Sequence, residues 1–129
     1  RIAVLAEAHF GDGGVPVVDR VVAAVDCGRL VNPDLVKQQV ENGLILGLST
    51  ALGSSSRIAR AMPMADRLSE LRLPRLADTP DITVELIPSE DAFGGAAEIG
   101  VPAIAPAVAN ALQASSGGRI RRLPLTDPA

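Results

Sequence analysis

Residues 32 to 53 carry the pattern that most restricts how this chain can fold, because they specify one long α-helix. Asn32 is a residue type that caps helices, Pro33 suits the first helical position, and Gly53 can end the helix. The face expected to be buried consists of Leu35, Val36, Val40, Ile45 and Leu48. An amphipathic helix of this kind predicts a second layer, a sheet or another helix, that covers its apolar face.

A row of small residues runs along the same helix. Gly43 and Gly47 are one helical turn apart, and Ala51 continues the row by a further turn. Such rows bring helices together in membranes, but charged residues flank this one, and the chain has no apolar run long enough to span a bilayer. The row therefore predicts that another backbone packs closely against this face.

Strand patterns lie on both sides of the helix. Residues 1 to 10 alternate weakly, residues 11 to 14 (GDGG) tolerate the positive φ angles of a turn, and residues 15 to 28 are nearly continuously apolar. These segments predict a hairpin whose second strand is buried on both faces. Residues 81 to 88 (DITVELIP) alternate again and predict a further strand. The inner face of the first strand is expected to carry Ile2, Val4 and Ala6.

A second helix is expected from Val101 to about residue 114, with Pro102 and Pro106 confined to roughly its first turn. Residues 119 to 125 (RIRRLPL) then predict either a final strand or an extended tail. Between the long helix and the strand at 81 to 88, no clear period is visible, which indicates a loop with short elements.

The order of these elements predicts an α+β fold, with a mixed sheet of about four strands and two main helices packed on it. A length of 129 residues suits one domain, so we expect a single domain over residues 1 to 129. The chain begins at Arg1 in place of methionine, which indicates a processed, tagged or partial polypeptide.

Composition argues against several kinds of site and partner. One cysteine, Cys27, cannot form an internal disulfide, and one histidine, His9, cannot anchor a zinc or iron–sulfur centre, so no metal site is expected within the chain. We expect Cys27 to be a small buried residue and His9 to lie exposed on an edge strand. An excess of acidic over basic side chains, with no basic stripe, argues against nucleic acid as a partner.

Three segments, in this order, resemble a known family. Similarity to the C-terminal part of the molybdopterin-binding large subunit of molybdenum hydroxylases runs through residues 20 to 52 (RVVAAVDCGRLVNPDLVKQQVENGLILGLSTAL), 72 to 90 (RLPRLADTPDITVELIPSE) and 94 to 125 (GGAAEIGVPAIAPAVANALQASSGGRIRRLPL). This family includes xanthine dehydrogenase, aldehyde oxidoreductases and isoquinoline 1-oxidoreductase. The resemblance is strongest to the beta subunit of the last.

The resemblance implies an activity that is expected only in a complete assembly. Members of the family hydroxylate an electron-poor carbon of an aldehyde or N-heterocycle with oxygen derived from water. The implied cofactor is molybdopterin cytosine dinucleotide, and none is expected in the isolated chain. The implied partners are the remainder of the molybdopterin-binding subunit and an iron–sulfur electron-transfer subunit, in the cytoplasm or the periplasm.

The resemblance also implies roles for four residues. Glu98 matches the family's catalytic glutamate, Gln39 matches a glutamine beside the pterin, and Gly94 and Gly95 match a glycine-rich approach of backbone to the cofactor. Its position alone, without the resemblance, favours the interpretation of Glu98 as an acid that stabilises the start of the second helix.

The chain departs from the family pattern on both sides of Glu98. Ala97 stands where relatives usually have glycine, and Ile99 stands where they often have proline. If the glycine served a positive φ, Ala97 would cost stability or move the carboxylate.

A rival hypothesis comes from a different class of function. The chain could be a non-catalytic, stand-alone or truncated module that folds alone or forms a homo-oligomer and binds no molybdenum. As part of an enzyme, it should expose an apolar face for the missing polypeptide along Gly43, Gly47 and residues 94 to 100. As a stand-alone module, it should bury that face or use it in a symmetric dimer.

Overall fold

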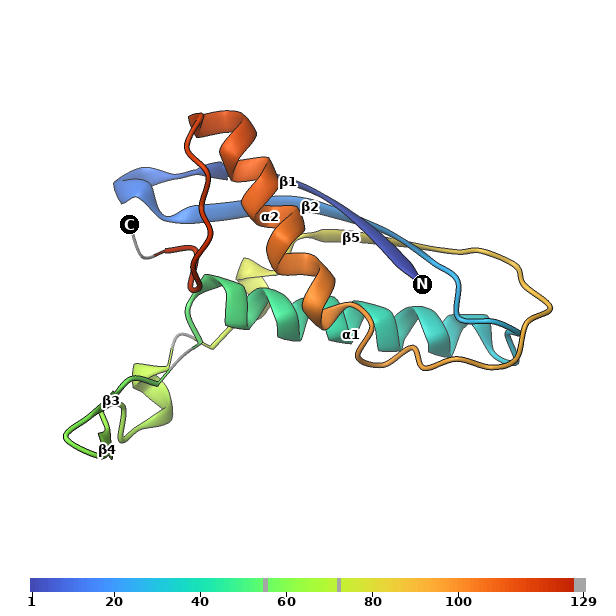
Figure 1. Ribbon diagram of the computed structural model, residues 1–129, viewed down its shortest axis with the longest axis horizontal. Helices are drawn as coiled ribbons and strands as arrows, with labels where there is room; N and C mark the ends of the chain where they lie inside the picture. The colour runs from blue at the N-terminus through green and yellow to red at the C-terminus, as the bar shows by residue number, and fades with distance from the viewer. Residues whose placement is uncertain (55, 72, 127–129) are drawn as a thin grey trace.

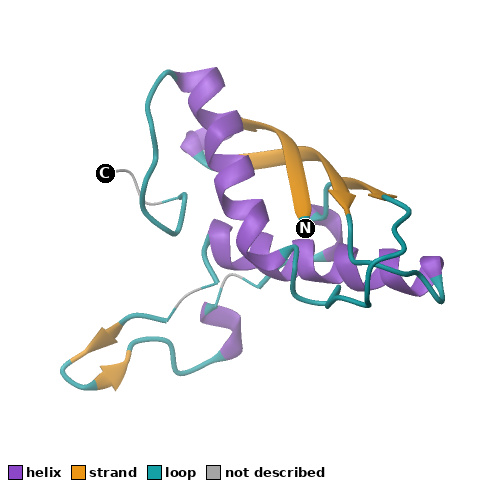
Figure 2. Cartoon of the chain, turned by 45° about the vertical axis from the view of Figure 1, so that its right-hand side comes forward, coloured by secondary structure: helices purple, strands orange, loops and turns teal. Residues whose placement is uncertain are grey.

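The computed structural model describes residues 1–54, 56–71 and 73–126. A three-stranded sheet in the order β1-β2-β5 forms one layer, and two helices cover one of its faces (Figure 1 and Figure 2). The main elements are β1 (Ile2–Phe10), β2 (Pro16–Val25), α1 (Pro33–Leu52), β5 (Asp81–Leu86) and α2 (Val101–Ser116). Neither helix is long and apolar enough to cross a membrane.

The sheet is mixed, which confirms the α+β class. β1 runs antiparallel to β2, with a bulge between Glu7 and Ala8, while β2 runs parallel to β5. α1 makes the crossover between the two parallel strands, as parallel pairing requires. The inner face of the sheet includes Ile2, Val4 and Ala6, as expected from the alternation.

Short elements occupy the segment without a clear period. They are β3 (Ile58–Ala59), β4 (Met62–Pro63), η2 (Leu68–Glu70) and η3 (Leu76–Asp78). A further short element, η1 (Asp12–Gly14), lies in the turn between β1 and β2. β3 and β4 form a small separate sheet. Residues 119–125 are not a strand, so the extended tail is the correct one of the two alternatives, and the main sheet has three strands.

The ends of α1 are built as the sequence predicts. The side-chain oxygen of Asn32 accepts a hydrogen bond of 3.1 Å from the backbone N–H of Leu35. The helix begins at Pro33, and Gly53 ends it with a φ of 134° while its N–H donates to the carbonyl of Ser49 over 3.2 Å. A side chain at position 53 would be strained at this φ, which explains why glycine ends the helix.

The buried face of α1 differs from the predicted one. Val40 and Leu48 are buried as expected, but Leu35 is 51% exposed, and Leu44 is among the largest fully buried side chains. The buried residues of the helix are Val40, Gly43, Leu44, Gly47, Leu48, Ser49 and Ala51. Because the glycine row also packs against backbone, the buried face is rotated from the one that the large side chains alone suggest.

Two further expectations need correction. β2 is buried on one face only: Val21 and Val25 are buried, whereas Val17 is exposed and Val22 is half-buried on the side that no helix covers.

In α2, Pro102 lies in the first turn, but Pro106 lies beyond it. Proline has no backbone N–H, so Pro106 leaves the carbonyl of residue 102 without its helical donor. Pro106 is exposed, where water can serve that carbonyl.

Leu44 gives the sharpest test of this core. We expect Leu44→Ala to lower the free energy of unfolding by about 2–5 kcal/mol, because it removes a fully buried side chain between the two helices. The matched control is Leu46→Ala, since Leu46 lies in the same helix and is 57% exposed, and it should lower the free energy of unfolding by no more than about 0.5 kcal/mol. Equal losses in urea unfolding of the two variants would contradict this packing.

Candidate functional site

The candidate site lies on the loop between β5 and α2, which is held to the domain at two places. At the first, the N–H of Arg29 donates to the carbonyl of Asp91 over 3.0 Å, and the N–H of Gly94 donates to the carbonyl of Cys27 over 2.8 Å. Gly28 has a φ of 80°, and a β-carbon there would collide with the carbonyl oxygen of Ala92. Glycine is therefore required at position 28 both by its φ and by the approach of the loop.

The second attachment is the glycine row of α1. A β-carbon on Gly43 would lie 2.6 Å from the carbonyl oxygen of Ala97, and one on Gly47 would lie 2.5 Å from that of Val101. Gly100 packs on Leu44 in the same way. The loop thus runs along α1 before it enters α2 (Figure 1), and the prediction of a backbone packed on the row is confirmed.

This contact corrects the expectation that an apolar face would be exposed along Gly43, Gly47 and the loop. Both glycines are buried, because the chain's own backbone covers them. Residues 94, 95, 97 and 98 of the loop are exposed. The face is therefore divided: the row is buried, as the stand-alone module predicts, and part of the loop is open, as the enzyme part predicts.

The structure places Gln39 on α1 and the other three predicted site residues on the loop that rests on α1 at Gly43 and Gly47. Gln39 lies one turn before Gly43 on the same row, next to the stretch of helix on which the loop rests. Gln39, Gly94, Gly95 and Glu98 are all exposed. A β-carbon on Gly95 would meet no atom within 4 Å. Backbone at Gly95 is therefore open to a ligand.

Glu98 does not cap the helix that follows it. The N-cap of α2 is Gly100, and α2 has neither a side-chain cap nor an acidic residue in its first turn. The backbone carbonyl of Glu98 accepts from the N–H of Val101 over 3.1 Å. Within residues 1–54, 56–71 and 73–126, its carboxylate takes part in no hydrogen bond or ion pair. The loop backbone that carries Glu98 is thus held at a defined place, and the carboxylate is left without an intramolecular partner among the described residues.

The departures from the family pattern beside Glu98 do not strain the backbone. Among the described residues, positive φ angles outside glycine occur only at Arg60 and Ala61, so Ala97 takes an ordinary conformation. Ile99 is half-buried and packs against the core. A glycine is therefore not needed at position 97, and Ile99 gives the loop an apolar anchor.

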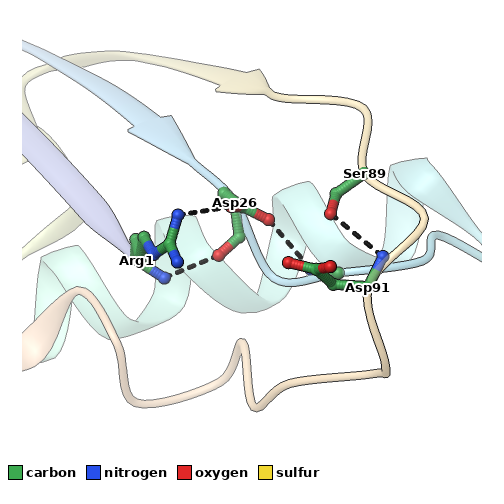
Figure 3. A network of polar contacts seen from close by, with 5 residues as sticks. Arg1, Asp26, Ser89 and Asp91 are labelled. Carbon is green, nitrogen blue, oxygen red and sulfur yellow. Dashed lines mark hydrogen bonds and ion pairs between the residues drawn. The ribbon is translucent and has the colours of Figure 1, made fainter.

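A polar hollow of about 240 Å³ adjoins Gly94 and Gly95. Figure 3 shows its wall: the amino terminus of Arg1 donates to the carbonyl of Asp26 over 2.6 Å, and the guanidinium lies 3.8 Å from the Asp26 carboxylate. The N–H of Asp91 donates to the hydroxyl of Ser89 over 3.2 Å. Asp26 and Asp91 both line the hollow, and two carboxylates would repel a phosphate group. We therefore assign the polar contacts around the hollow a structural role, which is to hold the loops together.

A larger cavity, of about 580 Å³, lies at the opposite end of the sheet, where β2 and β5 begin. None of the predicted site residues lines it. Its walls are largely apolar, and they include residues from the poorly patterned segment before β5. No motif in the sequence pointed to it, because its lining comes from four separate segments.

Known proteins match this chain in sequence over most of its length. The family described as molybdopterin cofactor-binding domain matches residues 11–80. The chain is 35% identical over 126 residues to the beta subunit of isoquinoline 1-oxidoreductase from Brevundimonas diminuta, an alignment that covers 97% of this chain and 16% of that protein. It is 34% identical over 112 residues to the membrane-bound aldehyde dehydrogenase (pyrroloquinoline-quinone) of Gluconacetobacter polyoxogenes, covering 87% and 14%.

Solved structures share the fold. Quinoline 2-oxidoreductase from Pseudomonas putida 86 matches with a TM-score of 0.79 and 20% identity, over 88% of this chain and 16% of that one. CO dehydrogenase from Oligotropha carboxidovorans matches with a TM-score of 0.73 and 23% identity, over 86% and 15%. The chain therefore spans about a sixth of the length of the proteins that it matches.

Proposed function

Because the chain belongs to the molybdopterin cofactor-binding domain family, we propose that it is the C-terminal domain of a molybdenum hydroxylase large subunit. In this proposal it supplies the catalytic base and part of the cofactor wall for the hydroxylation of aldehydes or N-heterocycles. Activity belongs to the complete assembly, since the chain spans only about a sixth of its relatives.

The observation that carries the proposal is the double attachment of the loop with Glu98. The loop is fixed by Gly28 at one end and by the row of Gly43 and Gly47 at the other, yet the carboxylate between them stays exposed. Holding a reactive group in one place is the main requirement for a general base. A purely structural acid would be expected to cap α2 or pair with a cation, and Glu98 does neither within the described residues.

The residues around Glu98 fit a pterin cofactor. Gln39 offers both donors and an acceptor, which suit the heteroatoms of a pterin. Gly95 has open space where a side chain would be, so that backbone can approach the cofactor, while Gly94 is tied back to Cys27. We infer that Gln39, Gly94 and Gly95 form one wall of the site, and that the cofactor is the cytosine dinucleotide form.

The cofactor, when bound, supplies the oxygen transfer and accepts the electrons of the reaction. The part of this chain is the proton transfer: the Glu98 carboxylate takes a proton from the attacking group and later releases it to water. Docking of the missing polypeptide would cover the exposed loop and exclude bulk water, which strengthens the interaction of a fixed carboxylate with its partner.

The partners follow from the same proposal. Several relatives are named as subunits, among them the xanthine dehydrogenase molybdenum-binding subunit of Escherichia coli O157:H7. We infer that this domain joins the remainder of a molybdopterin-binding subunit, and that electrons leave through a separate iron–sulfur subunit, because the chain has no cysteine cluster of its own.

The proposal is tested by activity of the assembly isolated through a tag on this chain from its host. The complex should oxidise aldehydes or N-heterocycles with an artificial electron acceptor, and in isotopically heavy water the heavy oxygen should appear in the product. A complex that oxidises its substrate with oxygen from another source would contradict the hydroxylase assignment.

One observation favours the rival, a non-catalytic module. The glycine row that was expected to receive the missing polypeptide is already covered by the chain's own loop. A stand-alone module would remain a stable monomer or homodimer and would bind no molybdenum when it is expressed together with its neighbouring subunits.

A further inference from the structure

Residues 56–71 form a hairpin arm that projects away from the sheet and the helices (Figure 1 and Figure 2). β3 and β4 pair at Ala59 and Met62, and the N–H of Met64 donates to the carbonyl of Arg57 over 2.8 Å. Every residue of the arm is exposed except Ala65 and Leu71, which are half-buried. The arm therefore gains little stability from burial within this chain.

Half of the exposed residues of the arm are apolar, and four of them are large. Ile58 is 77% exposed, Leu68 is 74% exposed, and Met62 and Met64 are exposed to a similar degree. Scattered apolar residues are normal on a surface, but a group on one projecting element marks an interaction site. Methionine side chains also adapt readily to a partner's surface.

The backbone of the arm also needs external support. Its turn places Arg60 and Ala61 at φ angles of 52° and 63°, a left-handed conformation that costs non-glycine residues about 1–2 kcal/mol each. Its strands have two residues each, and isolated two-stranded hairpins are at best marginally stable. Contact with a partner would offset these costs.

The relatives indicate which partner. The alignment with the isoquinoline 1-oxidoreductase subunit covers 97% of this chain, and the family match over residues 11–80 includes the whole arm. The arm is therefore not an insertion peculiar to this chain. The relative that shares the arm is much longer than this chain, and about five sixths of it lies outside the aligned segment. The remainder of the relative's own subunit is therefore available to cover the arm, and the corresponding polypeptide is the expected partner of the arm in this chain.

We propose that the hairpin arm docks into an apolar groove on the remainder of the molybdopterin-binding subunit, with Ile58 as its anchor. This inference rests on the proposed function and adds to it the surface by which the domain is held. In the hairpin Ile58 lies opposite Pro63, and Ala59 lies opposite Met62. Directly opposite residues share a face, so Ile58 and Pro63 form the apolar face that docks, and Met62 lies on the other face.

The test combines the full chain with the isoquinoline 1-oxidoreductase beta subunit of Brevundimonas diminuta from which the segment aligned to this chain is deleted. Affinity is measured by titration, and protection of the arm by hydrogen exchange. We expect arm amides to exchange more slowly in the complex. Ile58→Asp should weaken binding by about 30-fold or more, whereas Ile58→Val should retain it within a few-fold.

The isolated chain is the control for folding. Because Ile58 is exposed, Ile58→Asp should leave the midpoint of its own unfolding nearly unchanged. A complex whose arm still exchanges rapidly, and whose affinity Ile58→Asp does not alter, would overturn the inference while the proposed function stands. Failure of the unmodified chain to bind where the relative's own segment binds would count against both. Self-association of the free chain through the arm would make a second copy the partner and overturn the inference.

Discussion

Glu98→Gln is expected to lower turnover of the assembled enzyme by about 10²- to 10⁴-fold, the contribution typical of a general base. The amide keeps the size of the side chain but cannot accept a proton at neutral pH. Since the carboxylate is exposed and has no intramolecular partner among the described residues, the free energy of unfolding should change by no more than about 0.5 kcal/mol.

The matched control is Glu90→Gln, which makes the same change at another exposed position of the same loop. This variant should keep turnover and cofactor content. Single-turnover kinetics of the two variants, at equal molybdenum content, separate chemistry from cofactor loading. Retained turnover in Glu98→Gln would show that Glu98 is not the base, whether or not the chain is part of a molybdenum hydroxylase.

Gly43→Ala is expected to destabilise the domain by about 1–3 kcal/mol, because its β-carbon would lie 2.6 Å from the carbonyl oxygen of Ala97. Alanine alone would favour the helix by about 1 kcal/mol over glycine. The contact should outweigh this gain, because the atom that the β-carbon meets is backbone that is itself held at both ends. The measurement is urea unfolding of the isolated chain.

Asn42→Ala controls for helix propensity, since Asn42 is the exposed neighbour of Gly43 on α1. It should leave stability unchanged or raise it slightly. In the assembled enzyme, Gly43→Ala should also reduce turnover, because a displaced Ala97 carries Glu98 with it and catalysis tolerates little misplacement. An unfolding midpoint that rises in Gly43→Ala would show that the loop does not rest on the row as described.

Local signals predicted the elements well. The cap at Asn32, the end at Gly53 and the alternation of β1 each depend on residues within a few positions of one another, so the sequence displays them directly. The hairpin arm was not predicted, because its strands are two residues long and its turn carries Arg60 and Ala61 in place of glycine or asparagine.

Packing between distant segments was predicted less well. The glycine row indicated that some backbone would lie on α1, but helical periodicity could not identify it as the loop that carries Glu98. For the same reason, Leu35 was wrongly expected in the core and Leu44 was not expected there. The roles proposed for Gln39, Gly94, Gly95 and Glu98 came from family resemblance, since nothing in their spacing specifies a pterin site.

The most direct test of the central claim is the molybdenum content of the complex that contains this chain. The complex is isolated from the host through a tag on the chain, its polypeptides are identified by mass spectrometry, and its metal is measured by elemental analysis. We predict about one molybdenum per chain, together with a pterin and the remainder of the large subunit. A metal-free monomer or homodimer, isolated from cells that make the neighbouring subunits, would contradict the claim.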